Sequence, residues 1–170
     1  MATWNLDTAH SEVGFKVKHL MINNVKGQLN TFQIDVQQAG DDLKSASITF
    51  TADLSSIDTN NEQRDQHLKS GDFFDVEKFP SIQFKSTKYD SKELVGDLTI
   101  RDVTKSVTLA VEFGGIAKDP WGNTKAGFTV TGKINRKDWG LGWNAALETG
   151  GVLVGEDVSI TAEIQLVKQA

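Results

Sequence analysis

Apolar and polar residues alternate over eight stretches of this chain. The clearest is 158–166, in which Val, Ile, Ala, Ile and Leu occupy every second position, and 107–113 and 126–134 repeat the pattern. Because side chains alternate sides along a β-strand, each stretch predicts a strand with one apolar face and one polar face. The other five strands are expected at 13–17, 25–36, 46–54, 82–84 and 94–100, the fourth of these being short and weak.

The second of these runs contains a break in its pattern. Its apolar parity slips between Leu29 and Phe32, which indicates a β-bulge or a sharp bend. Between the third and fourth runs we expect the one helix, near residues 60–70, with Thr59 and Glu62 as a capping box and Gly71 at its exit. Asp119-Pro-Trp-Gly122 is typical of a turn between strands. The chain therefore reads as a single all-β antiparallel domain, residues 1–170, with one helical insertion.

The alternation fits both a closed barrel and a sandwich of two sheets. Small residues on the apolar faces, such as Gly96, Gly132 and Ala162, favour a barrel with a tunnel if they leave width unfilled. They fit a packed interior equally well if each receives a large neighbour. An extended eight-stranded antiparallel β-barrel is the architecture we expect.

Composition excludes several classes of protein. The 170 residues hold 38% hydrophobic residues, which suits a sheet buried on one face, and no apolar run is long enough for a membrane helix. Without cysteine there is neither a disulfide nor a thiolate metal site, and a net charge of −5 gives no overall attraction to nucleic acid. No signal peptide is visible, so we expect a cytoplasmic location, or a periplasmic one if an export signal has been removed.

Two sequence motifs resemble cofactor or metal sites only in their letters. Gly140-Leu-Gly-Trp-Asn-Ala145 matches a dinucleotide fingerprint, but Gly150-Gly151 follows too soon for the helix that the motif needs. His10 and His19 differ by nine positions, so on one strand they would point to opposite faces. We expect no cofactor and no metal.

Other polar residues leave alternatives open. Asp65, Asp72, Asp75 and Glu77 are close enough in sequence for an acid–base pair, although helix caps explain them more simply. Arg136 has the inward parity of its strand and therefore needs a partner, either an internal Asp such as Asp102 or Asp138, or the head group of a ligand. Three tryptophans lie in or beside loops, where they either guard a pocket mouth or plug a barrel end: Trp121, Trp139 and Trp143.

A set of motifs extends in order over nearly the whole chain. It comprises Asp7-Thr-Ala-His-Ser11, Ser56-Ile-Asp-Thr59, Arg64-Asp-Gln-His-Leu68, Asp72-Phe-Phe-Asp75, Phe79-Pro80, Leu98-Thr-Ile-Arg101, Val103-Thr-Lys105, Asp119-Pro-Trp-Gly122, Ile134-Asn-Arg136 and Asp138-Trp-Gly140. In order and spacing these motifs resemble the YceI-like, polyisoprenoid-binding family.

The resemblance implies a lipocalin-like barrel that holds a long apolar chain, such as a polyprenyl compound, an isoprenoid quinone or a fatty-acid derivative. It implies no catalytic residue. The chain departs from the family at Asp102, where Gly usually follows the Ile-Arg pair. If that position has a positive φ, Asp tolerates it less well than Gly.

We therefore expect a non-enzymatic protein that binds a polyisoprenoid or similar long-chain lipid inside the barrel for transport, storage or sequestration. The predicted lining residues share the apolar parity of their strands, and Arg136 is a possible contact for the head group. The lining set is Phe15, Val17, Ile34, Ile48, Phe50, Phe84, Leu98, Ile100, Leu109, Val111, Phe128, Val130, Ile160 and Ile164.

Two competing functions stay open on sequence alone. One is an enzyme that acts on an apolar substrate with Asp65, His67 and Arg136. The other is a sandwich that binds a protein partner through its outer face, for which the outward Thr, Ser, Lys and Glu residues offer little apolar surface. We expect no nucleic-acid partner and no stable membrane insertion, and a homodimer is left open.

Overall fold

The computed structural model describes residues 3–37, 43, 46–144 and 153–169. Within them the chain forms eleven antiparallel strands, one α-helix and three short 3-10 helices. The strands are β1 Trp4–Leu6, β2 Glu12–His19, β3 Asn23–Leu29, β4 Phe32–Gln37, β5 Ser47–Asp53, β6 Ile57–Asp58, β7 Ser81–Tyr89, β8 Glu93–Ile100, β9 Val103–Lys118, β10 Thr124–Asn135 and β11 Val154–Lys168.

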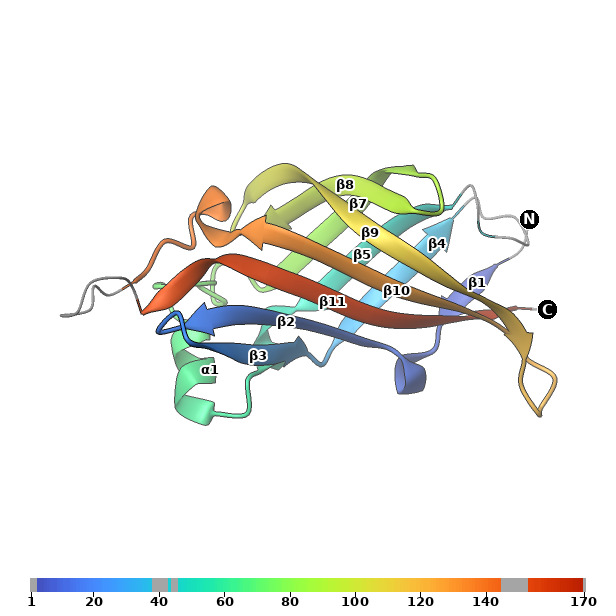
Figure 1. The fold of residues 1–170 in the computed structure, drawn as a ribbon, viewed down its shortest axis with the longest axis horizontal. Helices are drawn as coiled ribbons and strands as arrows, with labels where there is room; N and C mark the ends of the chain where they lie inside the picture. The colour runs from blue at the N-terminus through green and yellow to red at the C-terminus, as the bar shows by residue number, and fades with distance from the viewer. Residues whose placement is uncertain (1–2, 38–42, 44–45, 145–152, 170) are drawn as a thin grey trace.

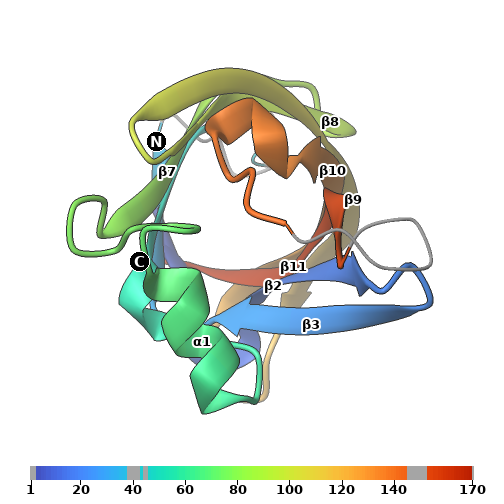
Figure 2. The same cartoon turned by 90° about the vertical axis from the view of Figure 1, so that its left-hand side faces the viewer.

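All the strands belong to one sheet, which curls around its apolar face. Its hydrogen-bonded order is β4-β5-β7-β8-β9-β10-β11-β2-β3-β6, and β1 pairs with β11. The long strands follow the long axis of the molecule (Figure 1), and the end-on view shows the sheet curling round on itself (Figure 2). The all-β antiparallel prediction is confirmed, and the two-sheet sandwich is excluded for the described residues.

The predicted count of eight strands is wrong. The eight predicted runs are all present, but the run at 25–36 is divided into β3 and β4, and the very short β1 and β6 add two more strands. The division falls at Asn30 and Thr31, where the parity slips. Before it, β3 pairs with β2, and after it β4 pairs with β5. The bend therefore connects β4, at one end of the sheet, to β3, which is next to the last strand at the other end. The hydrogen-bonded order does not close into a ring within the described residues, and the shape is a curled half-barrel.

The predicted helix is present as α1, Glu62–Lys69, but its cap differs from the expectation. Asn61 is the N-cap, and its side chain accepts a hydrogen bond from the backbone N–H of Arg64. The hydroxyl of Thr59 is used elsewhere: it donates to Asp65 Oδ1 at 2.5 Å and accepts from Arg64 Nε at 2.7 Å. Ser70, rather than Gly71, is the C-cap.

Two turns follow their sequence signals. Gly122 N–H donates to the carbonyl of Asp119 at 3.1 Å, as in a β-turn. Between β8 and β9, Arg101 and Asp102 have φ values of 52° and 65°, so Asp102 does occupy a left-handed position. Asp reaches this conformation more easily than most residues other than Gly and Asn, which explains why the turn persists.

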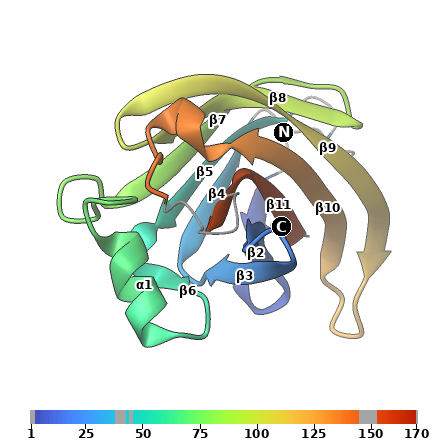
Figure 3. The ribbon, with the colours of Figure 1, turned by 60° about the vertical axis from the view of Figure 1, so that its left-hand side comes forward.

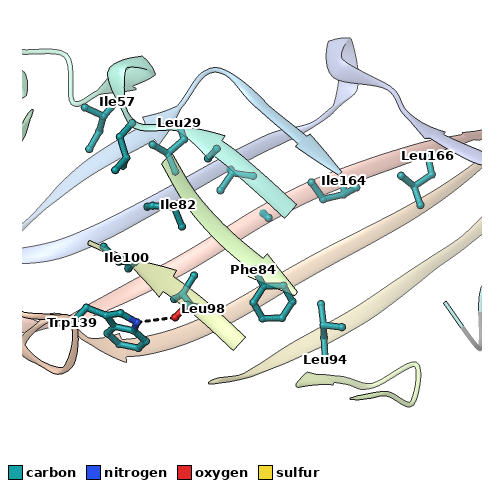
Figure 4. Packing of buried hydrophobic residues seen from close by; sticks show 14 of the residues in the cluster. Leu29, Ile57, Ile82, Phe84, Leu94, Leu98, Ile100, Trp139, Ile164 and Leu166 are labelled. Atoms are coloured by element: carbon teal, nitrogen blue, oxygen red, sulfur yellow. Dashed lines mark hydrogen bonds between the residues drawn. The ribbon is translucent and has the colours of Figure 1, made fainter. Parts of the chain in front are cut away.

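The core follows the inner face of the sheet. Figure 4 shows Leu98, Ile100 and Phe84 with residues of other strands, all of them buried. The indole of Trp139, in the 3-10 helix η3 (Arg136–Trp139), donates from Nε1 to the carbonyl of Leu98 at 2.9 Å. Trp139 is 3% exposed, so it belongs to the packed interior.

Candidate functional site

A cavity of about 420 Å³ lies inside the curl of the sheet. Phe15, Phe50 and Phe128 point inward by parity and line it, yet each is only half-buried. Inward residues that met tightly across the centre would be fully buried. Their partial exposure shows that these side chains face open space, so the interior is hollow along this part of the sheet.

All fourteen residues predicted from strand parity lie on the wall of this cavity. They come from β2, β4, β5, β7, β8, β9, β10 and β11. Their inward position follows directly from the period-two pattern, because each long strand has one face toward the cavity. Contact of these residues with a lipid stays a prediction.

The sequence did not predict most of the wall that lies outside the strands, which includes Leu68 of α1, Phe73 and Phe74 after it, and Leu141 after η3. Trp143, one of the loop tryptophans expected at a pocket mouth or a barrel end, also lines the cavity, whereas Trp139 is buried in the core and Trp121 is exposed. At the end of the cavity next to α1, His67, Phe73 and Trp143 form an aromatic cluster, with ring centroids 4.6–5.4 Å apart. No period-two signal marks these residues, since tertiary packing places them.

Two of the small inward residues, Gly96 and Gly132, do not widen the cavity. A Cβ at Gly96 would clash with the ring of Phe84, and one at Gly132 would clash with the side chain of Leu109. A large side chain from a neighbouring strand therefore packs over each glycine. This is the arrangement predicted for small residues in a packed interior.

Arg136 is 3% exposed and lines the cavity, but neither predicted salt bridge is present. Its guanidinium donates to four backbone carbonyls, those of Leu141, Trp143, Val154 and Gly155. Burial lowers the pKa of Arg136 from its ordinary value, and the charge of Glu156 opposes this shift. The expected pairing with Asp102 or Asp138 is wrong, because carbonyl oxygens solvate the charge.

The three residues of the enzyme alternative do not form one constellation. His67 and Arg136 line the cavity, whereas Asp65 does not. Asp65 accepts hydrogen bonds from both the backbone N–H and the hydroxyl of Thr59. The carboxylate that contacts His67 is Asp72 rather than Asp65, with 2.9 Å between His67 Nε2 and Asp72 Oδ2. Asp65 therefore supports the start of α1, and no acid–base group aimed at the cavity arises from it.

The remaining sequence motifs also have structural roles. His10 lies 2.8 Å from Asp7, and no group of three or more His, Cys, Asp or Glu side chains among the described residues is arranged to hold a metal. Gly140 is the C-cap of η3 in a left-handed conformation, and no helix follows it up to residue 144. Ala145, Gly150 and Gly151 lie outside the described residues.

The polar groups on the cavity wall are few. The ionisable ones other than Tyr89 are all basic or imidazole side chains: Lys18, His19, Arg64, His67 and Arg136. They come from the end of β2, from α1 and from η3, which lie at one end of the molecule (Figure 1), the end that is turned forward in Figure 3. Apart from these residues, Thr59 and Tyr89, the wall is apolar, which suits a ligand with a long hydrocarbon part.

Fold and cavity together define a curled antiparallel β-sheet protein that encloses an apolar space. The chain belongs to the YceI-like domain family, whose model matches residues 4–166. It is 43% identical over 166 residues to UPF0312 protein SA2479 of Staphylococcus aureus (strain N315), covering 97% of each chain.

Solved structures share this fold. The Campylobacter jejuni YCEI protein is 32% identical, with a TM-score of 0.75 and 96% of each chain covered. Burkholderia cenocepacia BcnA has a TM-score of 0.76 at 22% identity, covering 95% of this chain and 99% of its own. A polyisoprenoid binding domain from Saccharophagus degradans has a TM-score of 0.73 at 12% identity, covering 99% and 100%, respectively.

Among the described residues, no helix has the length and apolar character needed to cross a membrane.

Proposed function

We propose that this single domain holds a long apolar lipid in its central cavity, as a non-enzymatic carrier, store or sequestering protein. The observation that carries the proposal is the hollow apolar interior, of about 420 Å³, lined by inward residues of eight long strands. This volume lies within the range of about 300–1,000 Å³ that is common for ligand pockets. The similarity to a structure described as a polyisoprenoid binding domain supports the same ligand class.

The chemistry of the wall favours long chains over compact polar ligands. Each buried methylene contributes about 0.8 kcal/mol without any directional contact. Such burial distinguishes length and girth rather than functional groups, so polyisoprenoids, isoprenoid quinones and fatty-acid derivatives all fit the proposal. A head group at the α1 end would lie near Arg136, whose Nη2 makes one long hydrogen bond of 3.3 Å to Val154.

Native mass spectrometry of protein purified without added lipid tests the proposal. We expect bound species with the mass of a long-chain lipid, or binding of a quinone analogue to stripped protein. Phe128→Asp should reduce ligand retention strongly, because it places a carboxylate on the apolar wall. Thr131→Asp is the matched control, since Thr131 is an exposed, outward residue of the same strand.

A third variant separates binding from catalysis. His67→Ala removes a side chain of the cavity wall that the enzyme alternative requires. Under the binding proposal it leaves retention closer to that of the unmodified protein than Phe128→Asp does. The proposal is overturned if the purified protein carries no lipid and does not bind quinone analogues. It is also overturned if the protein turns over an apolar substrate and His67→Ala abolishes that turnover.

A further inference from the structure

The hairpin between β2 and β3 ends in an exposed apolar tip. Leu20, Met21 and Ile22 are 36%, 55% and 73% exposed and follow one another in the chain. Leu20 and Met21 have φ values of 54° and 61°, a region that hairpin turns normally fill with Gly, Asn or Asp. Polar turn residues would relieve both the strain and the exposure, so neither packing nor turn chemistry explains these three residues.

The outer face of the same hairpin is basic. Between Glu12 and Asp35 the sequence contains three lysines and no acidic residue, in a chain whose net charge is −5. Lys16, Lys18 and Lys26 are all exposed, and Lys18 also borders the cavity. Lys16 lies directly opposite Lys26 in the strand register. Like charges placed opposite each other destabilise a strand pair.

Among the described residues no ion pair relieves this repulsion, because none of the salt bridges found there involves these three lysines. On the neighbouring strand β11, Lys18 lies opposite the register shift between Val154 and Val158. Of the two carboxylates in that stretch, Glu156 pairs with Lys137 at 2.7 Å, and Asp157 forms none of the ion pairs found among the described residues. The lysine face is therefore available to an external anionic partner.

The tip is joined to the wall of the cavity. Leu20 N–H donates to the carbonyl of Leu153 at 2.8 Å, and His19 pairs with Val154 in the ladder between β2 and β11. Leu153, Val154 and His19 all line the cavity. The hairpin tip and α1 lie at the same end of the molecule, opposite the β9–β10 turn (Figure 1).

We propose that the β2–β3 hairpin docks this protein on the surface of an anionic lipid bilayer. Leu20, Met21 and Ile22 enter the membrane interface, and the lysine face meets the acidic head groups. A strand rises about 3.3 Å per residue, so Lys18 lies about 7 Å behind the tip, within the depth of the head-group layer. Lys16 and Lys26 lie about 13 Å behind it, where they add long-range attraction that salt weakens.

A bilayer fits these features better than a protein partner does. Three consecutive apolar side chains on a narrow tip form no broad or concave surface, whereas insertion into a fluid interface needs no complementary shape. The adjoining cavity wall is apolar, and an apolar ligand is most concentrated in membranes. Docking does not itself depend on ligand binding, so the two proposals can fail separately.

Vesicle flotation tests docking with stripped, full-length protein. The probes are vesicles of phosphatidylcholine alone and vesicles with about one-third phosphatidylglycerol. We expect binding to the anionic vesicles that weakens as salt is added. The double variant Met21→Ser, Ile22→Ser should reduce binding about tenfold or more, since it removes the inserted apolar groups. The triple variant Lys16→Gln, Lys18→Gln, Lys26→Gln should abolish the preference for phosphatidylglycerol.

Trp121→Ser is the matched control, because Trp121 is 83% exposed on the turn at the opposite end. It should leave vesicle binding unchanged. Circular dichroism establishes that each variant is folded, and light scattering gives its mass in solution. The proposal is overturned if the unmodified protein ignores both vesicles, or if Trp121→Ser weakens binding as much as the tip variant. It is also overturned if the tip variant only converts a dimer to a monomer without changing vesicle binding.

Discussion

The imidazole of His67 meets the indole of Trp143 edge-on, with ring centroids 4.6 Å apart and planes at 85°. Phe73 completes the cluster, 5.1 Å from His67 and 5.4 Å from Trp143. The contact joins α1 to the segment that follows η3, two parts of the chain far apart in sequence. Because all three rings line the cavity, they form part of its wall at the α1 end.

Trp143→Ala should speed release of a bound lipid by several-fold, because it removes the largest ring of this aromatic cluster. Replacing a fully buried tryptophan with alanine typically lowers the free energy of unfolding by about 3–5 kcal/mol. Because Trp143 is only half-buried, we expect a smaller loss. Dissociation of a fluorescent fatty acid measures the rate. Trp121→Ala, at the exposed opposite turn, is the control, and equal acceleration by both variants would contradict a role for the aromatic cluster.

Arg136→Met should destabilise the fold by about 2–4 kcal/mol, because it leaves several carbonyl groups without their donor. Those carbonyls belong to two segments on either side of residues 145–152, which the guanidinium holds together. Urea unfolding monitored by tryptophan fluorescence measures the loss.

Lys137→Met is the neighbouring control. Its ammonium pairs with Glu156 at 2.7 Å, but both side chains are about half exposed. Exposed pairs contribute about 0–1 kcal/mol, so this variant should be nearly as stable as the unmodified protein. Equal losses at the two positions would show that Arg136 does not hold these two segments together.

The period-two pattern was sufficient to predict the cavity wall contributed by the long strands. Parity alone decides which side of a strand faces inward, so residues such as Phe15 and Ile160 could be assigned without any knowledge of the fold. The bend after Leu29 was predictable for the same reason, because a slip in parity requires the chain to change faces or partners.

Features decided by competition between neighbours were not predictable. Thr59 fits a capping box by its spacing, but Asp65 and Arg64 occupy its hydroxyl, and Asn61 caps the helix. Arg136 was correctly placed inside, yet its carbonyl partners come from backbone that no side-chain pattern marks. Strands as short as β6, with two residues, contain too few positions to show a period.

The carboxylate of Asp7 should make the free energy of unfolding fall in acid. The Lys125 ammonium, with a smaller contribution from His10, holds the pKa of the Asp7 carboxyl at about 2, below its ordinary 3.8. Since the folded pKa is the lower one, the stabilisation is complete above pH 3.8 and is lost as the pH falls toward 2. Because solvent partly screens this ion pair, it stabilises the fold by about 1 kcal/mol.

Asp7→Asn should therefore be less stable than the unmodified protein near neutral pH and about equal to it near the lowest pH. Urea unfolding over a pH series measures the difference. Asp97→Asn is the control, because Asp97 is exposed and forms no ion pair among the described residues. A difference at Asp7 that persists unchanged into acid would contradict the assignment to its carboxylate.

Gly96 and Gly132 occupy similar inward positions on β8 and β10, yet alanine should affect them differently. A Cβ at Gly96 would clash with the Phe84 ring and lie 2.6 Å from the carbonyl oxygen of Lys85, which is backbone and cannot rotate away. At Gly132 the only clash is with the Cδ2 methyl of Leu109, and no other atom outside the adjacent residues comes closer than 3.7 Å.

We expect Gly96→Ala to cost about 1–3 kcal/mol through overpacking. Gly132→Ala should cost less than about 1 kcal/mol, because a change of the Leu109 rotamer relieves the contact and alanine is better suited than glycine to a strand. Urea midpoints at equal m-values measure both losses, and a larger loss at Gly132 would show that Leu109 is held as firmly as the Lys85 backbone.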